Sequence, residues 1–121
     1  PQGGIMPKEP LEQALFRELD EEVGISADLV SIDSQIKHWI YYRLPQQYIR
    51  HHVMPLCIGQ KQKWFLLRYL GDDASINVTK HQPHEFDDWA WVDFWEPLKR
   101  VVDFKRHVYQ EVLKNFEATI K

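Results

Sequence analysis

The stretch GGIMPKEPLEQALFRELDEEVGI, residues 3–25, decides the fold of this 121-residue chain. Pro10 can occupy the first turn of a helix, the residues after it through Val23 include neither Gly nor Pro, and Gly24 suits the position just past a helix end. The pattern therefore predicts a helix over residues 10–23, preceded by a glycine-containing turn.

Acidic residues in the second half of this helix share one side. At about 100° per residue, Glu22 falls roughly 40° and Glu21 roughly 60° from Glu18, on the stripe that carries Leu11 and Leu15. We therefore expect these carboxylates to point inward. Burying like charges is costly unless a cation compensates, and oxygen-only ligands select a hard ion, here Mg²⁺ with Mn²⁺ as a substitute. An isolated Glu-x-x-Glu-Glu is more typical of a solvated helix end, so the surrounding residues decide.

Those surrounding residues match a family signature, G-x5-E-x7-R-E-U-x-E-E-x-G-U, where U is a bulky apolar residue. The matching residues are Gly3, Glu9, Arg17, Glu18, Leu19, Glu21, Glu22, Gly24 and Ile25. Because every fixed position of this long motif is present, the chain resembles the Nudix hydrolase family. The resemblance implies an α/β fold, an α/β/α sandwich with a mixed sheet. It also implies early strands and a phosphate-contacting arginine upstream of Pro1, so we expect the chain to lack an N-terminal segment.

The remaining pattern agrees with an α/β or α+β class and with one domain over residues 1–121. β-Branched and aromatic residues predict strands, whereas turn-forming residues predict a long exposed loop. Apolar residues at helical spacing predict a closing amphipathic helix. The predicted segments are strands at Leu29–Ile32, Lys37–Leu44 and Lys63–Leu70, the loop at Gly71–Phe86, a β-like stretch at Trp89–Phe94 and the helix within Val101–Ile120.

The family resemblance also implies roles for the box residues. Glu18 and Glu22 would ligate Mg²⁺, Glu21 would be a further ligand or a proton acceptor, and the Gly3 carbonyl would be an additional ligand. The metal would neutralise phosphate oxygens and activate the attacking water.

Two further box residues would support these ligands. Glu9 would pair or cap near the helix start, although some members bring this position to a metal. Arg17, four residues before Glu21, could hold that carboxylate through hydrogen bonds. Lys8 stands where close relatives commonly have Gly.

Segments outside the box resemble bacterial RNA 5′-pyrophosphohydrolases; they are residues 1–5, 39–45, 58–65, 85–87 and 104–106. That resemblance places Glu85 at a metal-binding or general-base position on a loop. Gln60 and Lys63 would meet phosphate or nucleotide groups, while Phe104 and Lys105 would stack on a base and bind phosphate. Because side chains alternate along a strand, Gln60 and Lys63 cannot both face the substrate from a regular strand. Phe104 could instead belong to the core.

Three functions follow as alternatives. The first is removal of pyrophosphate from 5′-triphosphorylated RNA, which would promote mRNA decay. The second is hydrolysis of dinucleoside polyphosphates such as diadenosine tetraphosphate by the same apparatus. The third is a non-catalytic Nudix-fold nucleotide-binding module, against which the intact acidic residues count. The sequence identifies no protein activator.

Composition limits the setting. A formal charge of −3 argues against a protein that coats long nucleic acid. A single cysteine, Cys57, cannot form an intramolecular disulfide, and no apolar run is long enough for a bilayer, so we expect a cytoplasmic protein without a membrane partner. The histidines lack a zinc-like framework. We expect all five tryptophans to serve core and sheet packing.

Overall fold

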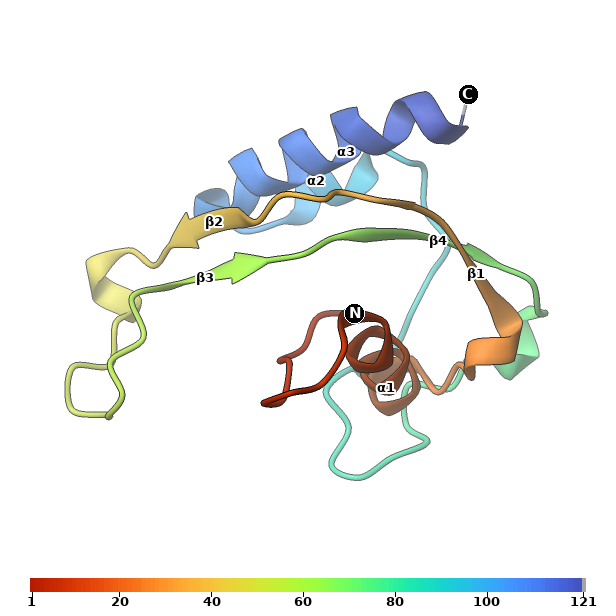
Figure 1. The fold of residues 1–121 in the computed structure, drawn as a ribbon, viewed down its shortest axis with the longest axis horizontal. Helices are drawn as coiled ribbons and strands as arrows, with labels where there is room; N and C mark the ends of the chain where they lie inside the picture. The colour runs from red at the N-terminus through yellow and green to blue at the C-terminus, as the bar shows by residue number, and fades with distance from the viewer. Residues whose placement is uncertain (121) are drawn as a thin grey trace. The chain divides into compact units, whose positions relative to one another are not determined.

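The structure, a computed structural model, describes residues 1–120 and divides into two compact units (Figure 1). The first unit comprises Pro1–Ser31 and Leu67–Trp91, and the second comprises Ile32–Leu66 and the described residues from Val92 onward. The single domain predicted for residues 1–121 stays a prediction.

The main element of the first unit is helix α1, Leu11–Val23, as the sequence predicted. It ends at Gly24, whose φ of 68° lies in the left-handed region and whose N–H donates to the Asp20 carbonyl at 2.9 Å. A Cβ at Gly24 would also lie 2.5 Å from the Asn77 carbonyl oxygen. Glycine is therefore required here both for its backbone conformation and for the close approach of a distant loop.

Four short strands form between residues 30 and 69. Strand β1, Val30–Gln35, pairs with β4, Phe65–Tyr69, while β2, Ile40–Arg43, pairs antiparallel with β3, Gly59–Gln62. In the second pair the registered partners run from Ile40 opposite Gln62 to Arg43 opposite Gly59. The predicted strands are confirmed with shifted bounds.

The sheets differ from the predicted single mixed sheet, although the combination of helices and strands is that of an α/β fold. Residues 1–120 form two two-stranded sheets. Parallel pairing needs a crossover connection, usually a helix. The connection from β2 to β3 instead carries only a 3₁₀ turn at Gln46–Tyr48, and the chain returns antiparallel beside itself.

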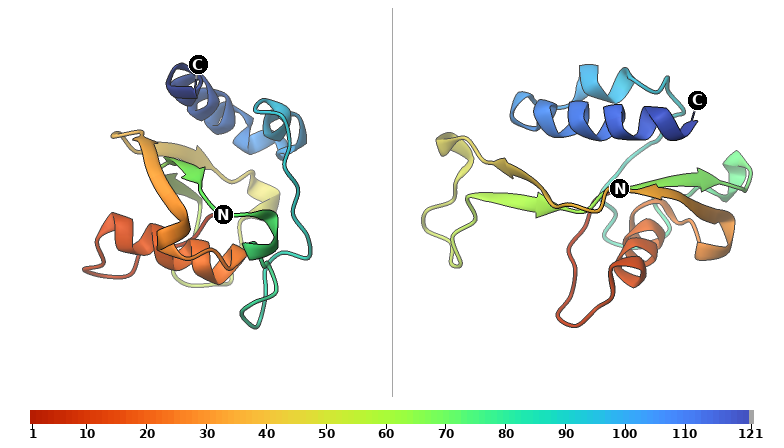
Figure 2. Two further views of the ribbon diagram at one scale, coloured as in Figure 1. Left: turned by 90° about the vertical axis from the view of Figure 1, so that its right-hand side faces the viewer. Right: turned by 45° about the horizontal axis from the view of Figure 1, so that its top comes forward.

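Helix α3, Arg106–Ile120, builds the core of the second unit and packs against β2, with α2, Glu96–Arg100, beside it (Figures 1 and 2). Its buried residues are spaced four apart, as an amphipathic helix requires. They pack with residues of β2 and of the turn before it. This cluster consists of Ile36, Ile40, Tyr42, Val108, Val112 and Phe116. The predicted closing helix is confirmed, but it begins at Arg106 after a 3₁₀ turn at Asp103–Lys105.

Two predictions about residues 71–94 have different outcomes. The exposed loop at Gly71–Phe86 is confirmed and contains one short 3₁₀ turn, Asp73–Ser75. The β-like stretch Trp89–Phe94 is not a strand, because its residues find no strand partner in the described part of the chain. Trp91 is 63% exposed, so its assignment to core packing was wrong. No helix within residues 1–120 combines the length and apolarity needed to cross a membrane.

Candidate active site

The segment before α1 lies directly against the helix in the first unit. A Cβ at Gly3 would lie 1.8 Å from Cδ and 1.9 Å from Oε2 of Glu18. Any other residue would force this carboxyl group to move, so glycine at position 3 lets the Glu18 carboxyl group keep its place. Lys8, in contrast, has a φ of 64°, a conformation that glycine adopts at lower cost.

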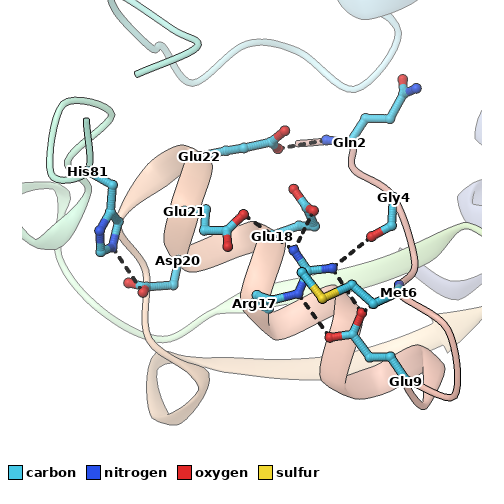
Figure 3. A network of polar contacts seen from close by, with 10 residues as sticks. All are labelled: Gln2, Gly4, Met6, Glu9, Arg17, Glu18, Asp20, Glu21, Glu22 and His81. Carbon is cyan, nitrogen blue, oxygen red and sulfur yellow. Dashed lines mark hydrogen bonds and ion pairs between the residues drawn. The ribbon is translucent and has the colours of Figure 1, made fainter. Parts of the chain in front are cut away.

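Arg17 binds both oxygens of Glu9 (Figure 3). Its Nε donates to Glu9 Oε2 and its Nη2 to Glu9 Oε1, each at 2.9 Å. The Met6 N–H donates to the same carboxylate at 3.0 Å. These bonds, with that from Arg17 the strongest, lower the pKa of Glu9 to about 2. With 6% of its side chain exposed, Glu9 is fixed between the loop and the helix.

The same guanidinium also holds the box acids. Its Nη1 donates to Glu18 Oε1 at 2.7 Å and approaches Glu21 Oε2 at 3.4 Å, while Nη2 donates to the Gly4 carbonyl at 2.8 Å. Figure 3 shows these groups around one arginine. The Glu21 side chain is 50% exposed, because it lies on the flank of the helix stripe. The expectation that all three acids point inward therefore fails for Glu21.

Glu22 is the buried acid of this helix, with only 2% of its surface exposed. The Gln2 N–H donates to its Oε2 at 2.8 Å, but no donor among the described residues reaches its Oε1. Burial, and next the carboxyl group of Glu85, raise the pKa of Glu22 to about 7. The loop residue Glu85 thus meets the helix at Glu22, and the proximity of the two carboxyl groups favours the protonated form of Glu22.

The loop that carries Glu85 is bound to the same helical turn through Asp20. Lys80 Nζ donates to Asp20 Oδ1 at 2.8 Å, and His81 Nε2 lies 3.1 Å from Oδ2 (Figure 3 shows the His81 contact). The hydrogen bond from Lys80 is the largest cause of a lowered pKa of Asp20. Sequence reasoning missed Asp20, because its partners lie about sixty residues away and no spacing rule connects them.

These residues fit a divalent cation by donor chemistry and by charge. The buried Oε1 of Glu22 has no hydrogen-bond partner within residues 1–120, so it is an oxygen donor that a cation could use. Hard cations prefer such ligands. In residues 1–120 no set of three or more His, Cys, Asp or Glu side chains is arranged to hold an ion. Arg17 instead occupies one oxygen of Glu18.

The second unit holds the other predicted residues. Lys63 joins Lys61 over the ring of Trp39, with Nζ-to-centroid distances of 5.1 and 4.7 Å, and Lys63 also donates to the Lys37 carbonyl. Gln60 instead accepts from Gln62 at 3.4 Å. Lys63 is thus grouped with Lys61 and not with Gln60, as strand alternation requires.

Phe104 is partly buried against the core and lies between two tyrosines. Its ring centroid is 5.8 Å from that of Tyr42 and 5.6 Å from that of Tyr48. Lys105 Nζ lies 5.2 Å from the Tyr42 centroid. Phe104 therefore has a packing role whatever else it does, while Tyr48 remains 54% exposed and offers aromatic surface beside it.

Comparison with known proteins agrees with the box geometry. The NUDIX domain profile matches residues 1–112. The RNA pyrophosphohydrolase of Serratia proteamaculans (strain 568) is 51% identical over 120 residues, covering 99% of this chain and 69% of that protein. The RNA pyrophosphohydrolase of Klebsiella pneumoniae (strain 342) is 52% identical, over 98% of this chain and 67% of that protein. That of Cronobacter sakazakii (strain ATCC BAA-894) is 49% identical, over 99% of this chain and 68% of that protein. The family profile matches most of the chain, and the alignments with these relatives span nearly all of it, so the chain belongs to the Nudix family of hydrolases.

Proposed function

We propose that this chain is an RNA 5′-pyrophosphohydrolase of the cytoplasm, which cleaves 5′-triphosphorylated RNA to pyrophosphate and a 5′-monophosphorylated RNA that is open to decay. The relatives are named for this activity, and their identity of about half over nearly the whole chain supports its transfer. The observation that carries the proposal is the buried, unpartnered oxygen of Glu22 beside Glu85. Such a pair is costly to maintain unless it serves a cation and a reaction.

Nudix hydrolases generally use divalent metals, and for this chain we propose Mg²⁺, with Mn²⁺ as a substitute. Glu22 and Glu18 would hold the ion, with Glu21 and the Gly3 carbonyl as further ligands and Glu85 contributing from its loop. When bound, the ion would neutralise phosphate oxygens and lower the pKa of a bound water.

The protein's own groups would prepare and complete the cleavage. Arg17 fixes Glu9, and through it the box loop, so the Gly3 backbone stays against Glu18. Glu85 would accept the proton of the attacking water, and its loop position allows it to approach the phosphates. Water adds at phosphorus, the anhydride bond between the α and β phosphates breaks, and the pyrophosphate leaves with the bond electrons.

Residues of the second unit would bind the RNA end. Phe104 would stack on a base beside Tyr48, and Lys105 would contact a phosphate. From the strand, either Lys63 would contact a phosphate or Gln60 would bond to the nucleotide, because the two side chains point to opposite faces. Stacking suits an enzyme that handles many RNA ends, because every base offers a π face.

One experiment separates the three functions that the residues allow. Turnover with Mg²⁺ is compared on 5′-triphosphate RNA, 5′-diphosphate RNA and diadenosine tetraphosphate, with Glu22→Gln as the control for catalysis by this site. We expect RNA to be cleaved faster than the tetraphosphate. A much higher kcat/KM for the tetraphosphate would support the dinucleoside polyphosphate hydrolase instead. Binding of all three without Mg²⁺-dependent turnover would leave a nucleotide-binding module.

A further inference from the structure

The loop that carries Glu85 is attached to α1 in two places. Near its start, the Asn77 N–H donates to the Val23 carbonyl at 2.8 Å, and the neighbouring Val78 is 7% exposed. Next, Lys80 and His81 reach the Asp20 carboxylate from consecutive positions. The loop therefore follows the last turn of the helix up to residue 81.

Between this attachment and Glu85 the loop has only local contacts of its own. Gln82 donates to the Thr79 carbonyl, and the His84 ring lies 3.3 Å from the Gln82 side chain and 3.5 Å from Asp87. Residues 82–84 are all exposed. Within the described chain, the Asp20 contacts are thus the last bonds to α1 before Glu85 itself, which lies four residues beyond His81.

Asp20 binds the loop from the turn of α1 that also carries Glu22. Each of its two oxygens has one partner, Lys80 on Oδ1 and His81 on Oδ2, so both partners can bind at once. Asp20 and Glu22 belong to one turn of α1 but lie about 160° apart around its axis, so residues 82–84 must carry the loop around the helix to bring Glu85 to the buried acid.

We propose that Asp20 is a positioning residue: by holding Lys80 and His81 it fixes the loop so that Glu85 faces Glu22. This inference rests on the proposed function, because it assumes that Glu85 takes part in turnover. Exposed ion pairs of this kind add little to global stability, but their contribution is sufficient to shift the population of a loop. We expect loss of the Asp20 contacts to lower kcat about three- to tenfold, which is the change in loop population that two exposed ion pairs can produce. The KM for RNA should not change.

Two variants of opposite charge test the attachment. Asp20→Asn removes a negative charge and Lys80→Gln removes a positive one. If the variants acted only by changing the electrostatic potential at the acidic site, kcat would rise in one variant and fall in the other. A positional role instead predicts a lower kcat in both variants at saturating Mg²⁺. Glu12→Gln, an exposed acid on the same helix, is the matched control. Opposite shifts, or no shift, would overturn the inference.

A readout independent of activity is the rate of tryptic cleavage after Lys80. In the parent protein this side chain is bound to Asp20, and we expect Asp20→Asn to be cleaved there roughly three to ten times faster. Cleavage after Lys114, an exposed lysine of the second unit, should not change. An unchanged rate at Lys80 would show that Asp20 does not hold the loop.

The Glu85→Gln background separates failure of this inference from failure of the proposed function. If Asp20 acts through Glu85, Asp20→Asn should lower the residual kcat of Glu85→Gln no further, measured with enzyme in excess. A full additional loss in that background would refute the inference alone. If Glu85→Gln turned over RNA as fast as the parent protein, the proposed role of Glu85 would be refuted. The positioning role of Asp20, which depends on Glu85, would then be refuted as well.

Discussion

Replacing Glu22 by glutamine tests whether the buried carboxylate is strained in the absence of a cation. Burial and Glu85 raise the Glu22 pKa to about 7 in the folded chain, against an ordinary value of 4.5. The folded state therefore binds this proton more tightly than the unfolded state. The free energy of unfolding must fall as the pH rises from about 4.5 through 7, and the loss is complete above that range.

The magnitude follows from the two pKa values. Each unit of difference corresponds to about 1.4 kcal/mol, so ionised Glu22 costs the metal-free protein about 3 kcal/mol at alkaline pH. About 2 to 3 kcal/mol of this cost develops between pH 5 and pH 8. The side chain introduced by Glu22→Gln cannot ionise, its carbonyl oxygen can still accept from the Gln2 N–H, and its amide can donate to Glu85. The variant should therefore match the parent near pH 5 and exceed it in stability at pH 8.

The assay is urea unfolding in EDTA at both pH values, with Glu12→Gln as the exposed control. The difference between parent and variant isolates Glu22 from the other titrating groups. Added Mg²⁺ should stabilise the parent at pH 8 and have much less effect on the variant. If parent and variant lose the same stability between pH 5 and pH 8, the reasoning from burial and Glu85 is wrong.

Three further variants address the rest of the site. Gly3→Ala places a methyl group within the Glu18 carboxyl, so we expect at least a tenfold loss of Mg²⁺-dependent kcat and weaker Mg²⁺ binding by calorimetry, with α1 retained by circular dichroism. Arg17→Lys keeps the charge but loses the paired bonds to Glu9, and should lower both kcat and the urea midpoint, whereas an unchanged midpoint would contradict the structural role. Phe104→Leu should raise KM for RNA roughly five- to a hundredfold if Phe104 stacks on a base, and a change in the urea midpoint alone would restrict it to packing.

Sequence rules predicted what depends on neighbours along the chain. The end of α1 at Gly24 follows from local backbone chemistry, and the burial of Val108 and Val112 follows from helical spacing. The stretch Trp89–Phe94 was predicted wrongly, because a strand requires a partner and alternation alone does not supply one.

The geometry of the site was less predictable for a related reason. A helical wheel places Glu21 and Glu22 on one stripe, but their exposures differ widely, because burial depends on the loops that cover each position. The wheel also pairs Arg17 with Glu21, whereas the shorter bonds of Arg17 reach Glu9 across a loop. Distant partners of this kind become visible only in three dimensions.

The distribution of charge around α1 explains why the demand for a cation falls on one place. Arg17 neutralises Glu9 and contacts Glu18, and Lys80 with His81 compensates Asp20, so the chain supplies its own cations to these acids. Among the described residues, Glu22 receives only one backbone N–H and faces Glu85. Had the chain been under selection for stability alone, an arginine or an amide at this buried position would remove the cost. The pair is therefore best understood as held ready for an external cation.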